Sequence, residues 1–136
     1  MSKYISDIQE LKNISKRLKK SKKKIVLCHG VFDVLHYGHL LHFKDSKKQG
    51  DILVVSITSD KFVKKNLRGP YFNENIRAKT ISEIKIVDYV YVSEFESSSK
   101  IIEVLKPNIY AKGMEYKNKK KDLAGNLSEE TKMLKK

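Results

Sequence analysis

Two histidines, His36 and His39, flank a glycine in the segment His-Tyr-Gly-His at residues 36–39. Imidazole N–H groups donate hydrogen bonds to phosphate oxygens, and protonation near neutral pH adds positive charge where a phosphoryl-transfer transition state needs it. Gly38 lets a triphosphate approach the backbone without meeting a side chain. Residues three apart lie on one side of a helical turn, so both imidazoles can face one ligand. The segment therefore predicts chemistry on a phosphate group.

The elements around this segment would place it where phosphate binds. Residues 25–28 are apolar and are closed by Gly30, a pattern typical of a buried strand, and a helical pattern runs from Tyr37 to Gly50. At a strand-to-helix junction, backbone N–H groups and the helix dipole favour a bound phosphate. Position and residue type thus agree on the same ligand.

The rest of the chain alternates helical and strand patterns. Apolar residues at helical spacing predict an amphipathic helix ahead of the main domain, namely Ile5, Ile8, Leu11 and Leu18. Further expected elements are strands at 51–58, 87–92 and 109–111, a helix from the cap Asn73 to about Lys85, and a short helix at 101–105 stopped by Pro107. This alternation predicts the α/β class, with a Rossmann-like open parallel sheet, helices on both faces and ligands beyond the carboxyl ends of the strands.

Length and charge bound the possible partners. The chain has 136 residues, which suits one compact domain, and its 29 Lys and Arg against 16 Asp and Glu give a formal charge of +13. Such a surface attracts polyanions, which are nucleic acid, acidic lipid or phosphate-bearing small molecules. The lysine-rich runs at 19–24 and 117–121 are, however, more typical of solvated loops and helix ends than of binding sites.

Cysteine usage and hydropathy indicate a cytoplasmic protein. The single cysteine, Cys28, excludes an intrachain disulfide and favours a reducing compartment. No apolar stretch approaches the roughly 20 residues needed to cross a bilayer, and the first residues lack an apolar signal core. We therefore expect neither a membrane span nor secretion.

The phrase Gly30-Val31-Phe32-Asp33, followed shortly by His-x-Gly-His, resembles the signature of the cytidylyltransferase-like nucleotidyltransferase superfamily. The resemblance covers residues 25–116. At residues 112–116 the phrase Lys-Gly-Met-Glu-Tyr is similar to the Lys-Gly-Gly-Asp-Tyr of bacterial heptose-phosphate adenylyltransferases. Glycerol-3-phosphate cytidylyltransferases share the first signature but are less similar around Lys112, which favours adenylyl transfer.

The resemblance implies a nucleotidyltransferase fold and activity. A phosphate oxygen of a phosphorylated sugar or polyol would attack the α-phosphorus of ATP or CTP and displace pyrophosphate, with Mg²⁺ held chiefly by the NTP. His36 and His39 would stabilise the α-phosphate charge, and Arg77 would neutralise the pyrophosphate. The implied site residues are catalytic His36, His39, Lys64 and Arg77; nucleotide-binding Gly30, Val31, Phe32, Gly38, Lys112, Gly113 and Glu115; and, at the substrate phosphate, Lys65 and Arg68.

Some of these residues also have plainer interpretations. Lys64, Lys65 and Arg68 taken alone are typical of solvated charges, and only their place in the motif makes them candidates. Asp33 is interpreted first as a turn-stabilising side chain that accepts backbone hydrogen bonds. A zinc site built from the cysteine and the four histidines is disfavoured, because their spacing fits neither a zinc finger nor His-Glu-x-x-His. No metal ligands are therefore predicted.

The sequence departs from the family pattern at its end. The family's last segment, rich in Ser and Thr, returns to the phosphate site after a fifth strand, whereas this sequence reaches Lys136 without it. A truncated sequence, a contribution from another chain and a degenerate family member all stay open. An unpaired sheet edge would result, and a second copy could cover it, so a homodimer is expected. The expected divisions are a helix and basic linker at 1–24, the nucleotidyltransferase domain at 25–116 and a polar segment at 117–136.

Two functions from other classes stay open. A catalytically impaired nucleotide-binding module would bind an NTP without releasing pyrophosphate. A basic nucleic-acid-binding protein would account for the charge and the tyrosines. Its lysine runs lie apart from the aromatic residues, and it would leave His36 and His39 unexplained, so a nucleic-acid partner is not expected.

Overall fold

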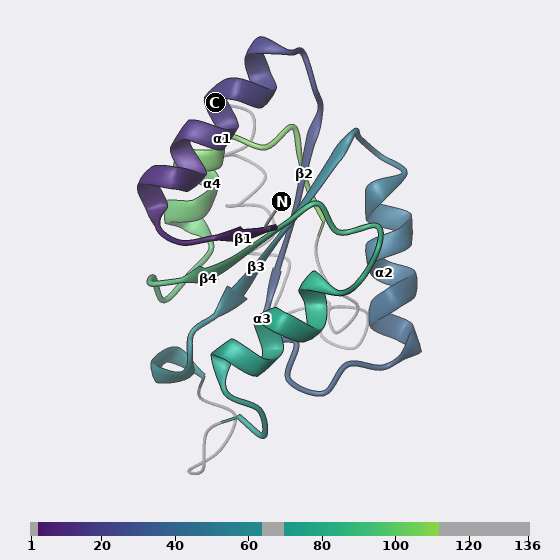
Figure 1. Cartoon of the computed structure of the whole chain (residues 1–136), viewed down its shortest axis with the longest axis vertical. Coiled ribbons are helices and arrows are strands. Elements are labelled where there is room, and N and C mark those ends of the chain that lie inside the picture. The colour runs from purple at the N-terminus through teal and green to yellow at the C-terminus, as the bar shows by residue number, and fades with distance from the viewer. Residues whose placement is uncertain (1–2, 64–69, 112–136) are drawn as a thin grey trace, which may run out of the picture.

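A single parallel sheet organises the chain in the computed structural model, which describes residues 3–63 and 70–111. Its strands are β1 (Tyr4–Ile5), β2 (Ile25–Gly30), β3 (Ile52–Thr58), β4 (Tyr89–Ser93) and β5 (Ile109–Tyr110). They lie in the order β1-β4-β3-β2-β5, and every neighbouring pair is parallel (Figure 1). The predicted open parallel α/β sheet is confirmed.

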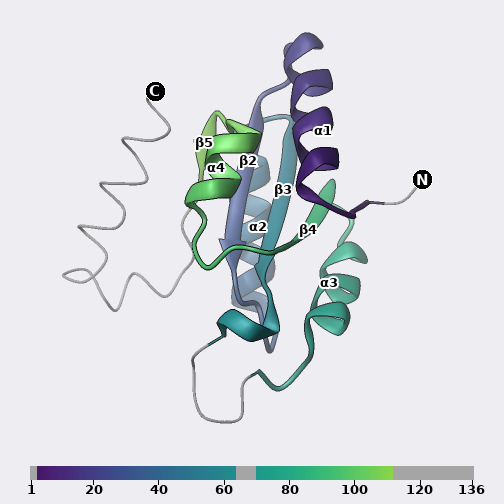
Figure 2. The same ribbon diagram turned by 90° about the vertical axis from the view of Figure 1, so that its left-hand side faces the viewer.

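Helices cover both faces of this sheet, as predicted. They are α1 (Ile8–Lys20), α2 (Tyr37–Lys47), α3 (Glu74–Ser82) and α4 (Ser99–Leu105), with a 3₁₀ turn, η1, at Asp60–Phe62. One core joins α1 and α4 to the sheet, and a second core joins α2 and α3 to the opposite face (Figures 1 and 2). Of the helices within the described residues, none is long and apolar enough to cross a membrane.

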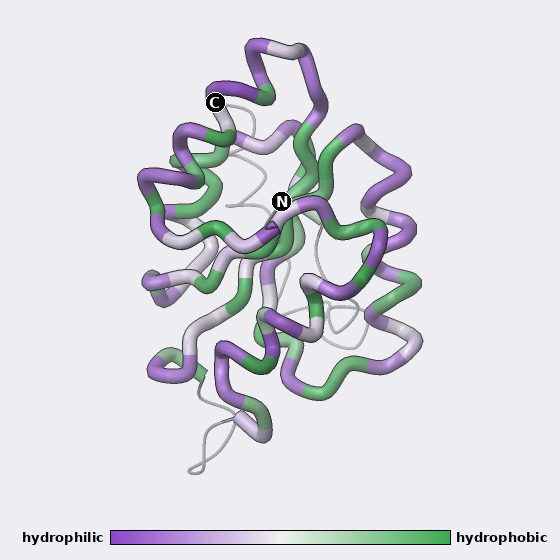
Figure 3. Tube along the Cα trace, viewed as in Figure 1, coloured by the Kyte–Doolittle hydropathy of each residue, from purple (hydrophilic) through white to green (hydrophobic). Residues whose placement is uncertain are grey.

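The strand sequences explain why the sheet is buried on both sides. Successive side chains of a strand point to opposite faces, so Leu27 and Val54 enter the α1/α4 core while Val26 and Val55 enter the α2/α3 core. The last six residues of β3 are all buried, as expected of a central parallel strand. Figure 3 shows the hydrophobic residues concentrated along the central strands.

Side-chain caps set where α1, α2 and α3 begin. The Asn73 side chain accepts a hydrogen bond from the Ile76 N–H at 2.9 Å, which confirms the predicted cap of α3. The helix ends at Ser82 rather than near Lys85, because the chain turns there and Ile84 packs against the α2/α3 core. Helix α4 ends after Leu105, because Lys106 adopts a left-handed backbone conformation just before Pro107.

The predicted start of the first helix at Ile5 is wrong. Ile5 belongs to β1 and pairs with Tyr91 of β4, which extends the sheet by an edge strand that the sequence did not suggest. The Asp7 carboxylate accepts from the Glu10 N–H at 2.8 Å and begins the helix after it. Ile5 is 1 % exposed and enters the same core as Leu11, which is why its spacing resembled a helical one.

Candidate active site

The topology of the sheet marks one end of β2 as a ligand site. The connection through α2 leads from β2 to β3 on one side, whereas the connection through α4 brings β5 to the other side of β2. Ligands of open α/β sheets bind at such a reversal, beyond the carboxyl ends of the strands. Residues 30–39 leave β2 at this point. The chain also leaves β5 here, towards Lys112, Gly113 and Glu115, which lie outside the described residues.

The side chains of His36 and His39 both bind backbone N–H groups in the first turn of α2. His36 is the N-cap, and its Nδ1 accepts a hydrogen bond from the Gly38 N–H at 2.9 Å. His39 Nδ1 accepts in turn from the His36 N–H at 3.1 Å. The arrangement is a capping box built from two imidazoles, and it holds the ring centroids 4.2 Å apart. The spacing predicted neighbouring rings, and the structure places them together.

This capping box determines which ring nitrogen carries the proton. An Nδ1 atom that accepts from a backbone N–H must be unprotonated, so the proton of the neutral ring is on Nε2. Both His36 and His39 therefore carry an Nε2–H donor while their Nδ1 atoms bind the backbone. Two N–H donors at a helix N-terminus suit a phosphate group.

Phe32 supports the turn from the core side. Its backbone has a positive φ of 50°, and the residue is 8 % exposed. Its ring packs edge-on against His39 and Phe43 at centroid distances of 5.9 and 5.2 Å. A Cβ atom on Gly30 would lie 2.9 Å from the tip of this ring, so a side chain there would displace it. The Phe32 side chain is thus used in packing, which leaves its backbone for the expected nucleotide contact.

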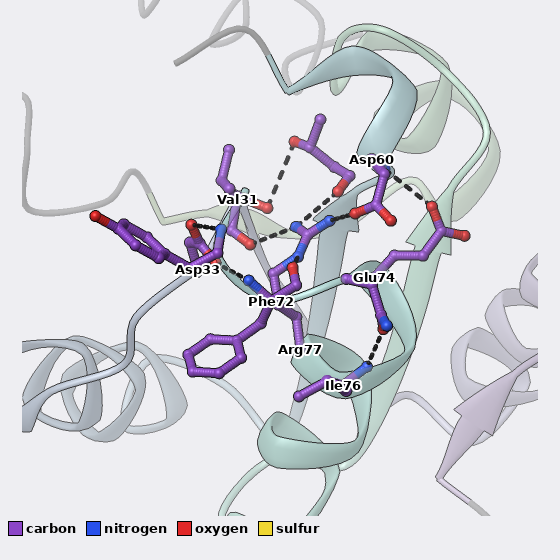
Figure 4. Close-up of polar contacts among 11 residues, drawn as sticks. Val31, Asp33, Asp60, Phe72, Glu74, Ile76 and Arg77 are labelled. Atoms are coloured by element: carbon purple, nitrogen blue, oxygen red, sulfur yellow. Dashed lines mark hydrogen bonds and ion pairs between the residues drawn. The ribbon is translucent and has the colours of Figure 1, made fainter. Parts of the chain in front are cut away.

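Asp33 accepts two backbone hydrogen bonds, as the plainer interpretation predicted. The donors are the N–H groups of Tyr71 and Phe72, at 2.7 and 2.8 Å (Figure 4). They lie 38 and 39 residues further along the chain rather than in the turn that contains Asp33. The carboxylate therefore joins the motif turn to the segment that leads into α3.

Arg77 is 1 % exposed, and its side chain reaches from α3 to the turn that follows β2. Its Nε donates to the Phe72 carbonyl at 2.9 Å, and one terminal nitrogen donates to the Val31 and Thr58 carbonyls, each at 2.8 Å. The other terminal nitrogen donates to Asp60 Oδ1 at 2.6 Å, an ion pair (Figure 4). The guanidinium that the sequence assigned to pyrophosphate is thus buried, and each of its three nitrogens donates to a protein acceptor.

The remaining candidates are the basic residues after η1 and the possible zinc ligands. Lys64, Lys65 and Arg68 lie outside the described residues, between Val63 and Pro70. Burial raises the pKa of the Cys28 thiol to about 12, which keeps it protonated and unsuited to bind zinc. Within residues 3–63 and 70–111, no three His, Cys, Asp or Glu side chains gather as a metal site would require.

Comparison with known proteins gives one family and several relatives. The model of the family described as cytidylyltransferase-like matches residues 27–134. The Bifunctional protein HldE of a Nitratiruptor species is 39 % identical over 119 residues, which are 85 % of this chain and 26 % of the relative. The protein of the same name from Helicobacter pylori (strain J99 / ATCC 700824) is 37 % identical over 130 residues, 93 % of this chain and 28 % of the relative. The chain thus spans about a quarter of the length of these relatives.

Two solved structures are also similar. A lipopolysaccharide core biosynthesis protein from Thermoplasma volcanium GSS1 is 40 % identical, with a TM-score of 0.60 over 65 % of this chain and 72 % of that one. A pantoate-beta-alanine ligase from Francisella tularensis, solved with an ATP compound and beta-alanine, has a TM-score of 0.51 at 17 % identity and covers 81 % of this chain and 56 % of its own. The second likeness concerns the fold alone.

Proposed function

The chain belongs to the cytidylyltransferase-like family, and on that premise we propose that it transfers a nucleoside monophosphate from ATP or CTP to a phosphorylated sugar or polyol. The observation that carries the proposal is the capping box of His36 and His39, which puts two Nε2–H donors on the first turn of α2. This turn follows β2 at the point where the strand order reverses. Donors so placed suit the α-phosphate of an NTP.

The reaction needs charge stabilisation rather than a covalent intermediate. An oxygen of the acceptor phosphate forms a bond to the α-phosphorus, and the bond from that phosphorus to the bridging oxygen breaks as pyrophosphate leaves. His36 and His39 donate to the non-bridging α-oxygens, and the N-terminus of α2 adds its partial positive charge. Gly38 lies within the same turn, where the absence of a side chain would let a phosphate approach the backbone. Positioning and electrostatics supply most of the rate in such transfers.

The remaining roles follow the family resemblance. Gly30, Val31 and Phe32 line the nucleotide with their backbone. Arg77, which the resemblance assigns to the pyrophosphate, donates instead to the Val31 carbonyl of that backbone. The basic residues after η1 and the segment after β5 are assigned by motif: Lys64 to the β- and γ-phosphates, Lys65 and Arg68 to the acceptor phosphate, and Lys112, Gly113 and Glu115 to the base and ribose. The pairing of β5 with β2 supports the last assignment, because it brings the chain that leads to Lys112 beside the chain that leads to His36.

ATP and a sugar phosphate are the substrates we favour. The phrase at residues 112–116 is closer to heptose-phosphate adenylyltransferases than to glycerol-3-phosphate cytidylyltransferases. The solved relative at 40 % identity is a lipopolysaccharide core biosynthesis protein, and lipopolysaccharide cores are built from sugars. A second copy of the chain is expected to complete a homodimer.

Magnesium would enter with the triphosphate and neutralise charge on the β- and γ-phosphates. The residues of the site fit a metal that is held by the nucleotide. The Nδ1 lone pairs of His36 and His39 accept backbone N–H groups, and the carboxylates of Asp33 and Asp60 bind backbone and guanidinium donors. These atoms therefore already form hydrogen bonds and an ion pair within the protein.

Calorimetry followed by a turnover assay tests the proposal. The chain is titrated with ATP and with CTP in the presence of magnesium, and pyrophosphate release is then measured with a panel of sugar and polyol phosphates. We expect one NTP to bind preferentially and pyrophosphate to appear only when an acceptor is present. Binding without release would identify a nucleotide-binding module instead, and the absence of NTP binding, together with salt-sensitive RNA binding, would favour the nucleic-acid class.

A further inference from the structure

We propose that Asp33 and Arg77 are positioning residues of the transfer reaction, which hold the turn carrying His36 and His39 onto the segment that leads into α3. The inference rests on the proposed function, because it concerns the placement of that function's phosphate donors. Neither side chain needs to touch substrate for this role. Both act through the backbone of the turn.

Asp33 and Arg77 both bind the backbone of Phe72. The Phe72 N–H donates to Asp33, and the Phe72 carbonyl accepts from Arg77 Nε. Arg77 then donates to the Val31 carbonyl, two residues before Asp33 (Figure 4). Residues 31–33 are therefore attached to the segment before α3 at two points, through the Val31 carbonyl and the Asp33 carboxylate. Two attachments fix both the distance and the orientation of this short stretch.

The turn has little regular structure of its own. Residues 31–36 between β2 and α2 belong to neither helix nor strand, so no ladder of backbone hydrogen bonds holds them in place. The contacts of Val31 and Asp33 therefore supply much of what fixes the start of α2. Misplacing a catalytic group by about 1 Å can reduce the rate about 100-fold, so such contacts matter for turnover.

The charge of Arg77 and the planar shape of its guanidinium suit this role, and a lysine side chain would not replace it. Its side chain is fully buried, and its positive charge is balanced by Asp60, whose backbone N–H in turn donates to Glu74 at 2.9 Å. The planar guanidinium reaches acceptors on three separate segments, at Val31 after β2, Thr58 at the end of β3 and Phe72 before α3. A lysine ammonium is a point donor on a flexible stem and lacks the fixed fork that these positions require.

The test compares Asp33→Asn and Arg77→Lys with a control that makes the same Asp-to-Asn change at another carboxylate that accepts a backbone N–H. Asp51→Asn is that control, because the Asp51 carboxylate accepts from the Lys24 N–H at 2.8 Å before the start of β3, at the other end of the sheet. We measure kcat and KM for the NTP well below each variant's Tm, and count folded sites by NTP binding. Asp33→Asn and Arg77→Lys should lower kcat by about 10- to 100-fold with KM changed less than about threefold. Asp51→Asn should retain the kcat of the parent.

A purely structural role predicts a different pattern. It would lower Tm in Asp33→Asn and Arg77→Lys and leave kcat per folded site unchanged in both, and that result would overturn the inference. If the parent chain releases no pyrophosphate, the proposed function fails, and the inference is judged by long-range ¹H–¹⁵N NMR of the imidazole rings. Shifted His36 and His39 resonances in Asp33→Asn, but not in Asp51→Asn, would support it, whereas unchanged resonances in both variants would refute it.

Discussion

His36 has two separable tasks, and one pair of substitutions should divide them. Its Nδ1 caps α2 by accepting from the Gly38 N–H, and its Nε2–H is the donor proposed for the α-phosphate. Asparagine is a strong N-cap, since its side-chain oxygen accepts the same backbone N–H groups, but it has no donor at the position of Nε2. Alanine can perform neither task.

The two contributions differ in size and in the quantity they affect. Loss of an N-cap costs about 1 kcal/mol of unfolding free energy, so His36→Ala should be destabilised by about that amount and His36→Asn much less. Loss of one donor to a developing transition-state charge lowers kcat by about 100- to 1,000-fold. Both variants should therefore show the large fall in kcat, and only His36→Ala should also show the fall in stability.

Urea denaturation and single-turnover pyrophosphate release measure the two effects on the same preparations. Near-parental kcat in His36→Asn would refute the catalytic assignment and leave His36 as a helix cap alone. Equal destabilisation of the two variants would refute the capping argument instead. Because the two readouts are independent, neither failure could be mistaken for the other.

Three further predictions concern groups outside the proposed chemistry. Asn73→Ala should lower the unfolding free energy by about 1 kcal/mol in urea denaturation, because it removes the acceptor of the Ile76 N–H. Cys28, whose thiol pKa burial raises to about 12, should resist alkylation at pH 8 in the folded protein and react once urea unfolds it; rapid labelling of the native chain would contradict this. Burial, with a smaller effect of Glu94, raises the pKa of Tyr91 to about 12. Since the unfolded chain then ionises first, this stabilising contribution is complete below about pH 10 and is lost as the pH rises towards 12, and Tyr91→Phe should fall less steeply over that window in pH-dependent denaturation.

Most of the fold could be predicted because its signals are local. The β-branched run of β3 and the Asn73 cap of α3 each depend on residues close together in sequence. The edge strand β1 could not be predicted in this way. It has two residues, and it exists because Tyr4 and Ile5 pair with β4 some 86 positions later, as the register Tyr4↔Val90 and Ile5↔Tyr91 shows. The pattern of residues close together in sequence contains no information on a pairing between such distant segments.

The same distinction separates His36 and His39, whose proximity the spacing predicted, from Arg77, whose contacts no local pattern could predict. His39 Nδ1 accepts from the His36 N–H three residues earlier, and His36 Nδ1 accepts from the Gly38 N–H, so the local spacing encodes the geometry. Arg77 binds Val31 across 46 residues and Asp60 across 17, and no spacing rule connects them. An arginine in a phosphate-binding motif suggests a direct contact with phosphate. Arg77 is instead buried, donates to the Val31 carbonyl and forms an ion pair with Asp60. A charged residue in a motif can therefore bind the backbone that carries the proposed donors, and only the tertiary structure shows that contact.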